Sequence, residues 1–259
     1  MKLLVLALLG MALTSGAFGA IRMDKCDYTC NGVELQGYIV WDDTIQGRRP
    51  GVMVVHEWWG VNDYVTKRAQ QLAGLGYVAF VADMYGKGVL AKTPEEARKL
   101  ATALRQDRKL MRARAQAGLN ILTIVPLCDP TRVAAMGYCF GGGVVLELAR
   151  SGADVKGVIS FHGNLDTPNP ADAKNIKGKV LVLTGADDPS VPPKQVEAFV
   201  DEMRAANVDY QVVLYGGAVH AFTNPASGND PKRGAAYCAA ADRRSWEAMR
   251  QFFAEIFAR

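Results

Sequence analysis

Short runs of apolar residues recur along the chain and are separated by longer stretches with a helical pattern. Most of these runs are rich in valine and have the length of strands that are covered on both faces of a sheet. Strands that alternate with helices in this order predict an α/β fold, with a doubly wound, mostly parallel sheet and helices on both faces. The predicted core strands are Gly51–His56, Tyr77–Ala82, Arg132–Tyr138, Lys156–Phe161, Lys179–Thr184 and Tyr210–Tyr215.

The clearest helix start lies at Thr93, whose side chain can cap the first turn. Pro94 has the backbone angle suited to a first helical position, and Glu96 completes a capping box with Thr93. We expect one long helix from here to Ile124. Ahead of the core strands, Val33–Trp41 has strand character and predicts a hairpin arm.

Residues 1–20 have the pattern of an export signal, because Lys2 precedes the apolar run Leu3–Leu13 and small residues follow up to Ala20. The apolar run is shorter than the roughly 20 residues of a membrane span. We expect cleavage after Ala17, Gly19 or Ala20, giving a periplasmic or secreted protein without a membrane anchor. The alternative is a buried N-terminal helix. No repeat or linker interrupts residues 21–259, which predicts a single domain.

The composition, with 49% hydrophobic and 22% charged residues, is that of a globular protein and excludes a disordered or coiled-coil chain. Lysines and arginines are interspersed with acids at a net charge of +4, so no nucleic-acid partner is expected. Five cysteines are an odd number for an exported protein. Cys26, Cys30, Cys128 and Cys238 can supply two disulfides, with Cys26 and Cys30 close enough to pair locally, which leaves Cys139 free.

A predicted strand, a glycine-flanked turn and a helix follow one another around Cys139. The sequence from Gly137 to Gly141 reads G-x-C-x-G, a nucleophile elbow with cysteine in place of serine. A side chain at either glycine would obstruct the sharp turn. The turn sets the thiol at a helix N-terminus, which favours the nucleophilic thiolate, and the backbone N–H of Phe140 can donate to an oxyanion. An isolated motif of this kind is also compatible with an inert core cysteine.

Two later loops supply an acid and a histidine in the order that α/β-hydrolases use after the nucleophile. Asp188 follows the strand Lys179–Thr184, and His220 follows the last predicted strand. We assign Asp188 as the acid that orients the base, with Asp187 as the alternative, and His220 as the base. His56 and His162 fit the expected order less well.

The segment after the first core strand contains Glu57, Trp58 and Trp59, at the place where such folds hold the second oxyanion donor. We expect this donor to be the backbone N–H of Trp58. Glu57 is expected beside Cys139, where it can accept the thiol proton or hydrogen-bond to the thiol; the alternative is a solvated carboxylate. The two tryptophans either pack in the core or the rim, or they touch substrate. No second histidine stands four residues after His56, so no zinc motif and no metal site are predicted.

Five motifs in this order resemble the dienelactone hydrolase family (carboxymethylenebutenolidases) over most of residues 33–257. The resemblance implies the α/β-hydrolase fold, makes Asp188 catalytic and gives Glu57 a gating role beside the resting thiol. It also makes Tyr85, Trp59 and Asn224 the expected substrate contacts. The family uses an arginine where this chain has Asn224, which argues for a substrate other than dienelactone. The matching segments are residues 56–62, 82–86, 137–142, 188–192 and 220–222.

The expected function is therefore hydrolysis of a carboxylic ester or lactone through a Cys139 thioester, with no cofactor and a small-molecule substrate as the partner. A broad acyl esterase or peptidase on the same fold is the first alternative, because a fold does not set the substrate. A thiol-redox or ligand-binding protein, in which Cys139 is a disulfide partner, is the second. The oligomeric state is left open, with a monomer among the options.

Overall fold

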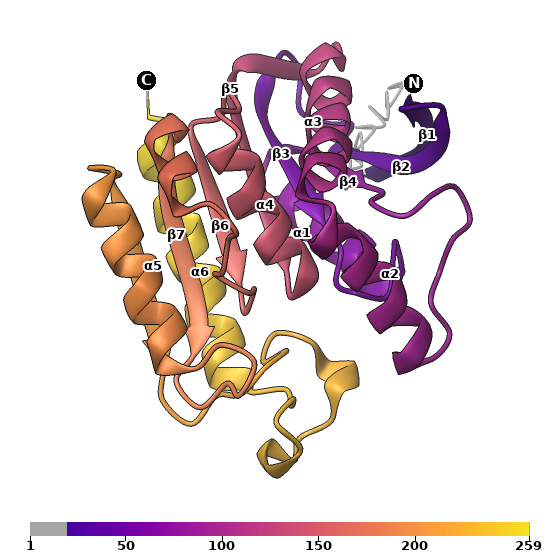
Figure 1. Ribbon diagram of the computed structural model, residues 1–259. Helices are drawn as coiled ribbons and strands as arrows, with labels where there is room; N and C mark the ends of the chain where they lie inside the picture. Colours follow the sequence, from indigo (N-terminus) through magenta and orange to yellow (C-terminus); the bar gives the residue numbers. More distant parts are fainter. Residues whose placement is uncertain (1–19, 259) are drawn as a thin grey trace, which may run out of the picture.

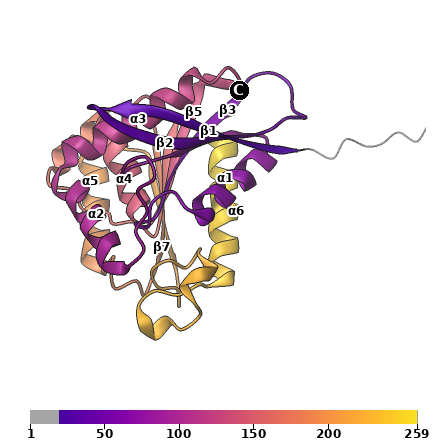
Figure 2. The same cartoon turned by 90° about the vertical axis from the view of Figure 1, so that its right-hand side faces the viewer.

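The computed structural model describes residues 20–258, which build an eight-stranded sheet with the order β1-β2-β4-β3-β5-β6-β7-β8. Strands β4, β3, β5, β6, β7 and β8 are parallel, and β1 and β2 form an antiparallel hairpin at one edge (Figure 2). The strands are β1 (Ile21–Cys30), β2 (Val33–Asp42), β3 (Arg49–Val55), β4 (Val78–Ala82), β5 (Cys128–Tyr138), β6 (Gly157–Phe161), β7 (Lys179–Gly185) and β8 (Tyr210–Tyr215).

Helices cover both faces of this sheet (Figure 1). On one face, α1 and α6 pack on alternate strand residues such as Val52 and Val54; on the other, α2 to α5 pack on residues such as Met53 and Val55. The doubly wound α/β architecture predicted from the apolar runs is confirmed. The helices are α1 (Asp63–Gly74), α2 (Pro94–Gln106), α3 (Arg108–Ile124), α4 (Phe140–Arg150), α5 (Pro193–Ala205) and α6 (Ala239–Ile256), with 3-10 turns η1 (Pro170–Asn175), η2 (Pro225–Ser227) and η3 (Pro231–Arg233).

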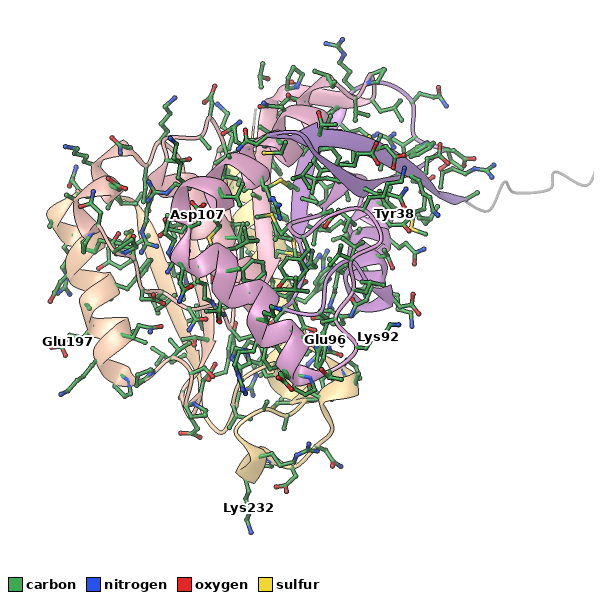
Figure 3. The ribbon with its side chains drawn as sticks, turned by 45° about the vertical axis from the view of Figure 1, so that its right-hand side comes forward. Tyr38, Lys92, Glu96, Asp107, Glu197 and Lys232 are labelled. Carbon is green, nitrogen blue, oxygen red and sulfur yellow. The ribbon has the colours of Figure 1, made fainter. Side chains whose placement is uncertain are left out.

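The prediction of one long helix up to Ile124 is wrong, because the chain breaks at Asp107 between α2 and α3. Asp107, labelled in Figure 3, caps the second helix by accepting a hydrogen bond from the backbone N–H of Leu110 at 2.9 Å. The predicted cap at Thr93 is present, since its hydroxyl accepts from the N–H of Glu96 at 3.2 Å. Aspartate is more favourable at the start of a helix than inside one, which explains why the chain begins a new helix at Asp107.

All five cysteines are free thiols in the structure, so the expected pair of disulfides is absent from the described chain. Cys26 and Cys30 both lie on strand β1, which sequence reasoning had not recognised as a strand. Four residues of extended chain separate their Cα atoms by about 13 Å, and a disulfide needs less than about 7 Å. The local pairing of these two cysteines is therefore excluded by the hairpin.

The order of the strands places a topological switch point, which we call the crevice, at the carboxyl ends of β3 and β5. The chain steps from β3 to β4 on one side and then crosses to β5 on the other side of β3. Open parallel sheets bind their ligands at such a switch point.

The predicted signal segment lies outside the described residues, apart from Ala20. None of the helices described has the length and apolar character needed to cross a membrane.

Candidate active site

Cys139 forms the junction between β5 and α4, with φ 53° and ψ −115°. This left-handed backbone is strained for a residue with a side chain and is found mostly at functional turns. The flanking glycines make it sterically feasible. A Cβ on Gly137 would lie 2.1 Å from the carbonyl oxygen of Gly141, and a Cβ on Gly141 would lie 2.3 Å from that of Val55. The chain therefore needs glycine at both positions to hold the cysteine in this turn.

The side chains of Cys139, His220 and Asp188 form a continuous hydrogen-bonded row. His220 Nε2 lies 3.1 Å from Cys139 Sγ, and His220 Nδ1 lies 2.8 Å from Asp188 Oδ2. The other carboxylate oxygen of Asp188 accepts from the backbone N–H of Ser190 at 2.7 Å. Asp188 is buried, whereas Asp187 is exposed, so the geometry selects Asp188 from the two candidate acids.

The loop that carries His220 is held by backbone pairing with a later segment. The N–H of His220 donates to the carbonyl of Gly234, and its own carbonyl accepts from Ala236. Burial lowers the pKa of His220, but contact with the Cys139 sulfur and with Asp188 outweighs it and raises the pKa well above the usual value. A protonated imidazole beside the sulfur favours the thiolate, the form that attacks carbonyl carbon.

Glu57 is buried close to this row, with 4% of its surface exposed. Burial raises the pKa of the Glu57 carboxyl to about 7, even though the Asn224 hydrogen bond and the positive charge of His220 act in the opposite direction. The side-chain amide of Asn224 donates to the Glu57 carboxyl at 2.7 Å. Among the described residues, the hydrogen-bond partner of the Cys139 thiol is His220 and not Glu57. Asn224 was expected to touch substrate, but its amide nitrogen is occupied by Glu57 and its oxygen accepts from the N–H of Ala226.

Phe140 and Trp58 carry the two backbone N–H groups expected to serve as oxyanion donors. Phe140 occupies the first turn of α4, where helix geometry leaves the N–H without an intrahelical acceptor. Trp58 lies on the loop after β3, and its carbonyl accepts from the Tyr85 hydroxyl at 3.0 Å. The rings of Trp58 and Trp59 meet edge to face at 5.2 Å. Tyr85 and Trp58 thus brace the wall of the crevice next to Phe140.

His56 and His162 are completely buried, and each has both ring nitrogens engaged inside the protein. His56 contacts the carbonyl of Glu57 through Nδ1 and accepts from the N–H of Met84 through Nε2. Burial lowers the pKa of His56, which keeps the ring neutral. His162 Nδ1 accepts from the backbone N–H of Cys139 itself. Sequence reasoning gave His162 no part in the site; its place directly after β6, beside the elbow strand, was the available signal.

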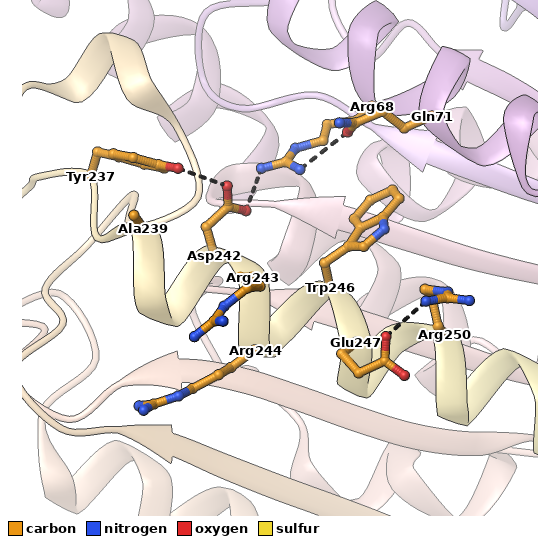
Figure 4. Close-up of a pocket in the computed structure, with 10 residues that line it drawn as sticks. All are labelled: Arg68, Gln71, Tyr237, Ala239, Asp242, Arg243, Arg244, Trp246, Glu247 and Arg250. Carbon is orange, nitrogen blue, oxygen red and sulfur yellow. Dashed lines mark hydrogen bonds and ion pairs between the residues drawn. The ribbon is translucent and has the colours of Figure 1, made fainter.

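No group of three or more His, Cys, Asp or Glu side chains among residues 20–258 is arranged to hold a metal ion. A recess of about 620 Å³ opens between α1 and α6 (Figure 4), and Cys139 is not among the residues that line it. Arg68 forms part of its lining and pairs with Asp242 at 2.6 Å, under the ring of Trp246. The residues that line the recess include no cysteine, serine or histidine. The crevice at Cys139, where a thiol, an imidazole and a carboxylate meet, is therefore the candidate active site.

Comparisons with known proteins show which sequences and structures this chain resembles. A model of the dienelactone hydrolase family matches residues 35–257. A protein of Aquifex aeolicus (strain VF5), provisionally named as a carboxymethylenebutenolidase, is 31% identical over 234 residues that cover 88% of this chain and 96% of the relative. A "Probable 2-oxo-3-(5-oxofuran-2-ylidene)propanoate lactonase" of a Bradyrhizobium species is 27% identical over 219 residues, covering 78% of this chain and 84% of that protein. The solved structure of a dienelactone hydrolase-like promiscuous phosphotriesterase from metagenomic libraries is 42% identical, with a TM-score of 0.88, and covers 93% of this chain and 100% of its own.

Proposed function

The chain belongs to the dienelactone hydrolase family, and from this premise we propose that it hydrolyses carboxylic esters or lactones with Cys139 as the nucleophile. The observation that carries the proposal is the row Cys139–His220–Asp188, with distances of 3.1 and 2.8 Å, at the tip of a strained elbow. Nucleophile, base and orienting acid within hydrogen-bond reach define this class of covalent catalysis. The names of the lactonase and carboxymethylenebutenolidase relatives support the same substrate class.

In the proposed reaction, the Cys139 thiolate attacks the acyl carbon, and the backbone N–H groups of Phe140 and Trp58 donate hydrogen bonds to the carbonyl oxygen as negative charge develops on it. Collapse of this intermediate breaks the ester C–O bond, and the leaving oxygen takes the proton of His220. A thioester remains on Cys139. Water then adds to the thioester as His220 removes its proton, and cleavage of the C–S bond releases the acid and restores the thiolate.

Glu57 and Asn224 form the second part of the proposal. A buried carboxyl whose pKa lies near 7 can exist in either protonation state at working pH. Asn224 holds it through one hydrogen bond and adds no charge. The arginine that the family resemblance implies at this position would instead attract a substrate carboxylate. We therefore assign Asn224 to positioning Glu57, and the substrate is expected to be an ester or lactone without a carboxylate at that point.

A second candidate activity is hydrolysis of phosphotriesters. It is favoured by the 42% identity to the dienelactone hydrolase-like promiscuous phosphotriesterase, whose name states that reaction. The same thiolate would attack phosphorus, and the same N–H groups would face the phosphoryl oxygen. Measuring kcat/KM for an ester and a phosphotriester with the same leaving group would show which of the two activities is greater.

The test of function compares purified wild type with Cys139→Ala on aryl esters, lactones, aryl phosphotriesters and peptides. Cys26→Ala is the matched control, because Cys26 is a half-buried free thiol on strand β1, outside the crevice. We expect ester or lactone turnover in wild type and Cys26→Ala and none above background in Cys139→Ala. Equal turnover in all three proteins would overturn the assignment of the nucleophile, and activity on peptides alone would overturn the substrate class.

Export to an oxidising compartment is also proposed, on the pattern of residues 1–20. The mass of the mature protein from expressing cells would test it: loss of 17, 19 or 20 residues supports export, and an intact leader contradicts it.

A further inference from the structure

A chain of buried hydrogen bonds runs from helix α1 to the backbone of the proposed nucleophile. Tyr64 Oη lies 2.6 Å from Thr223 Oγ1, and Thr223 Oγ1 lies 2.7 Å from His162 Nε2. His162 Nδ1 then accepts from the N–H of Cys139 at 3.2 Å. Thr223 and His162 are fully buried, so water does not compete for these contacts.

The direction of these bonds sets one tautomer of His162. Because Cys139 contributes an N–H, the facing Nδ1 must be an unprotonated acceptor. The ring proton then lies on Nε2 and is donated to the Thr223 hydroxyl. Burial, followed by the positive charges of His220 and Arg68, keeps the pKa of His162 well below its usual value. The ring therefore stays neutral while its neighbour His220, at 5.3 Å between ring centroids, carries a proton.

The far end of the chain is anchored. Arg68 donates to the carbonyl of Thr223 at 2.7 Å and to Tyr64 Oη at 3.3 Å. Asp242 fixes the same guanidinium at 2.6 Å, as Figure 4 shows at the edge of the recess. Thr223 is therefore held by two residues of α1, its hydroxyl by Tyr64 and its backbone carbonyl by Arg68, and Asp242 of α6 holds Arg68 in turn.

The geometry points to His162 as a positioning residue of the proposed nucleophile, with Thr223 as the group that fixes its tautomer. This inference rests on the proposed hydrolysis at Cys139. The N–H of Cys139 has two acceptors, His162 Nδ1 and the carbonyl of Phe161 at 3.0 Å, and together they hold the strained turn. With the proton on the other ring nitrogen, two N–H groups would face each other at 3.2 Å and push the elbow out of place.

The pair Thr223→Val and Thr223→Ser tests whether the Thr223 hydroxyl fixes the tautomer of His162. Valine keeps the shape and removes the hydroxyl, whereas serine keeps the hydroxyl. We expect Thr223→Val to lower kcat for an aryl ester by roughly ten- to a hundredfold with KM unchanged, since small misplacements of reacting groups have effects of this size. Thr223→Ser should stay close to wild type. Equal kcat in the two variants would overturn the inference.

Thr184→Val is the matched control. Thr184 is also fully buried, and its hydroxyl has no hydrogen-bond partner within the described residues. The same substitution there removes a buried hydroxyl without touching His162, so kcat should not change. A loss in Thr184→Val as large as that in Thr223→Val would mean that buried hydroxyl removal in general is harmful, which would overturn the specific role of Thr223.

NMR of nitrogen-labelled histidine in the resting protein gives a readout that needs no activity. We expect the His162 shifts of wild type and Thr223→Ser to report a proton on Nε2 and none on Nδ1. A protonated Nδ1 in wild type would overturn the inference. If no substrate is turned over by any variant, the proposed function fails while this measurement still decides the tautomer; if Cys139→Ala alone loses activity and both Thr223 variants retain it, only the inference fails.

Discussion

Helix α4 carries a cluster of buried ionisable side chains at each end, and the two clusters are built differently. At its C-terminus, Arg150 is 1% exposed and meets both carboxylate oxygens of Glu202 at 2.8 Å and Glu147 at 3.1 Å. Glu147 pairs in turn with Arg112 at 2.8 Å. Each charge faces an opposite charge in a fixed geometry, which is the arrangement that buried ion pairs require.

At the N-terminus of α4, the cluster of Cys139, His220, Asp188 and Glu57 contains groups whose protons can move. The pKa of Glu57 lies near 7 because of burial, and that of His220 is raised by its contacts with sulfur and carboxylate. Both ends suit the helix dipole, with a cation at the C-terminus and a thiolate site at the N-terminus. Burial of charge alone therefore does not mark a site of chemistry. Titratable groups whose pKa values are shifted at the carboxyl edge of a sheet are candidates for such a site.

The largest effect is expected from His220→Ala. Loss of the base should lower kcat for ester hydrolysis by at least about 10⁴-fold, since members of such a triad act as a unit. The variant leaves the buried Asp188 carboxylate with the N–H of Ser190 as its remaining partner, so the melting temperature should also fall. Kinetics and thermal unfolding of the same preparation measure both. A kcat within about tenfold of the wild-type value would contradict a catalytic role for the cluster at the N-terminus of α4.

The next effect concerns the other end of α4. Arg150→Met leaves Glu147 and Glu202 buried with fewer partners and should lower the free energy of unfolding by about 3–5 kcal/mol. Arg250→Met is the matched control, because Arg250 pairs with Glu247 at the surface, where both side chains are about half exposed, and should cost less than about 1 kcal/mol. Urea unfolding compares them. Equal losses would remove the distinction between a buried structural cluster and a surface pair.

Glu57→Gln tests the titrating cluster through stability. In the folded wild-type protein the Glu57 carboxyl stays protonated up to about pH 7, whereas in the unfolded chain it loses its proton near the ordinary pKa of 4.5. Between these values the folded state binds more protons, so wild-type stability should fall with rising pH, by about 3 kcal/mol in all. Glutamine has no such proton, and it can still accept from Asn224. The stability gain of the variant over wild type should grow from pH 5 to pH 8; a gain independent of pH would contradict the raised pKa.

The smallest effect is expected from Tyr85→Phe. It removes the hydroxyl that donates to the Trp58 carbonyl at 3.0 Å and so loosens one wall of the proposed oxyanion site. One hydrogen bond of this kind is worth about 1 kcal/mol, or roughly fivefold in kcat. Steady-state kinetics on an aryl ester measure the change. An unchanged kcat would show that the Trp58 peptide is held in place without Tyr85.

Local signals in the sequence were sufficient to predict the elbow. Gly137 and Gly141 flank Cys139 within five residues, and the loops of Asp188 and His220 each follow an apolar strand. The dihedral strain at Cys139 and the Cβ contacts at both glycines match that reading. Parallel strands bring their carboxyl ends together, so order along the chain was enough to gather these groups.

Long-range and finely balanced features were not predictable in this way. His162 and Thr223 are 61 residues apart, and only the packed structure shows their bond. The helix break at Asp107 depends on whether an aspartate caps a new helix or continues the old one, a small difference in free energy. Strand β1 is mostly exposed and so lacks the apolar run of the core strands. Cysteine number indicated disulfides, but pairing depends on distances that a sequence does not contain.

The central claim is that the acyl group passes through a thioester on Cys139. Rapid mixing of the wild-type protein with an aryl ester, followed by an acid quench and mass spectrometry of the intact protein and its peptides, tests this directly. The account predicts one acyl group per chain, located on the peptide that contains Cys139 and absent from Cys139→Ala. An acyl group on any other residue, or turnover by Cys139→Ala at the wild-type rate, would contradict it.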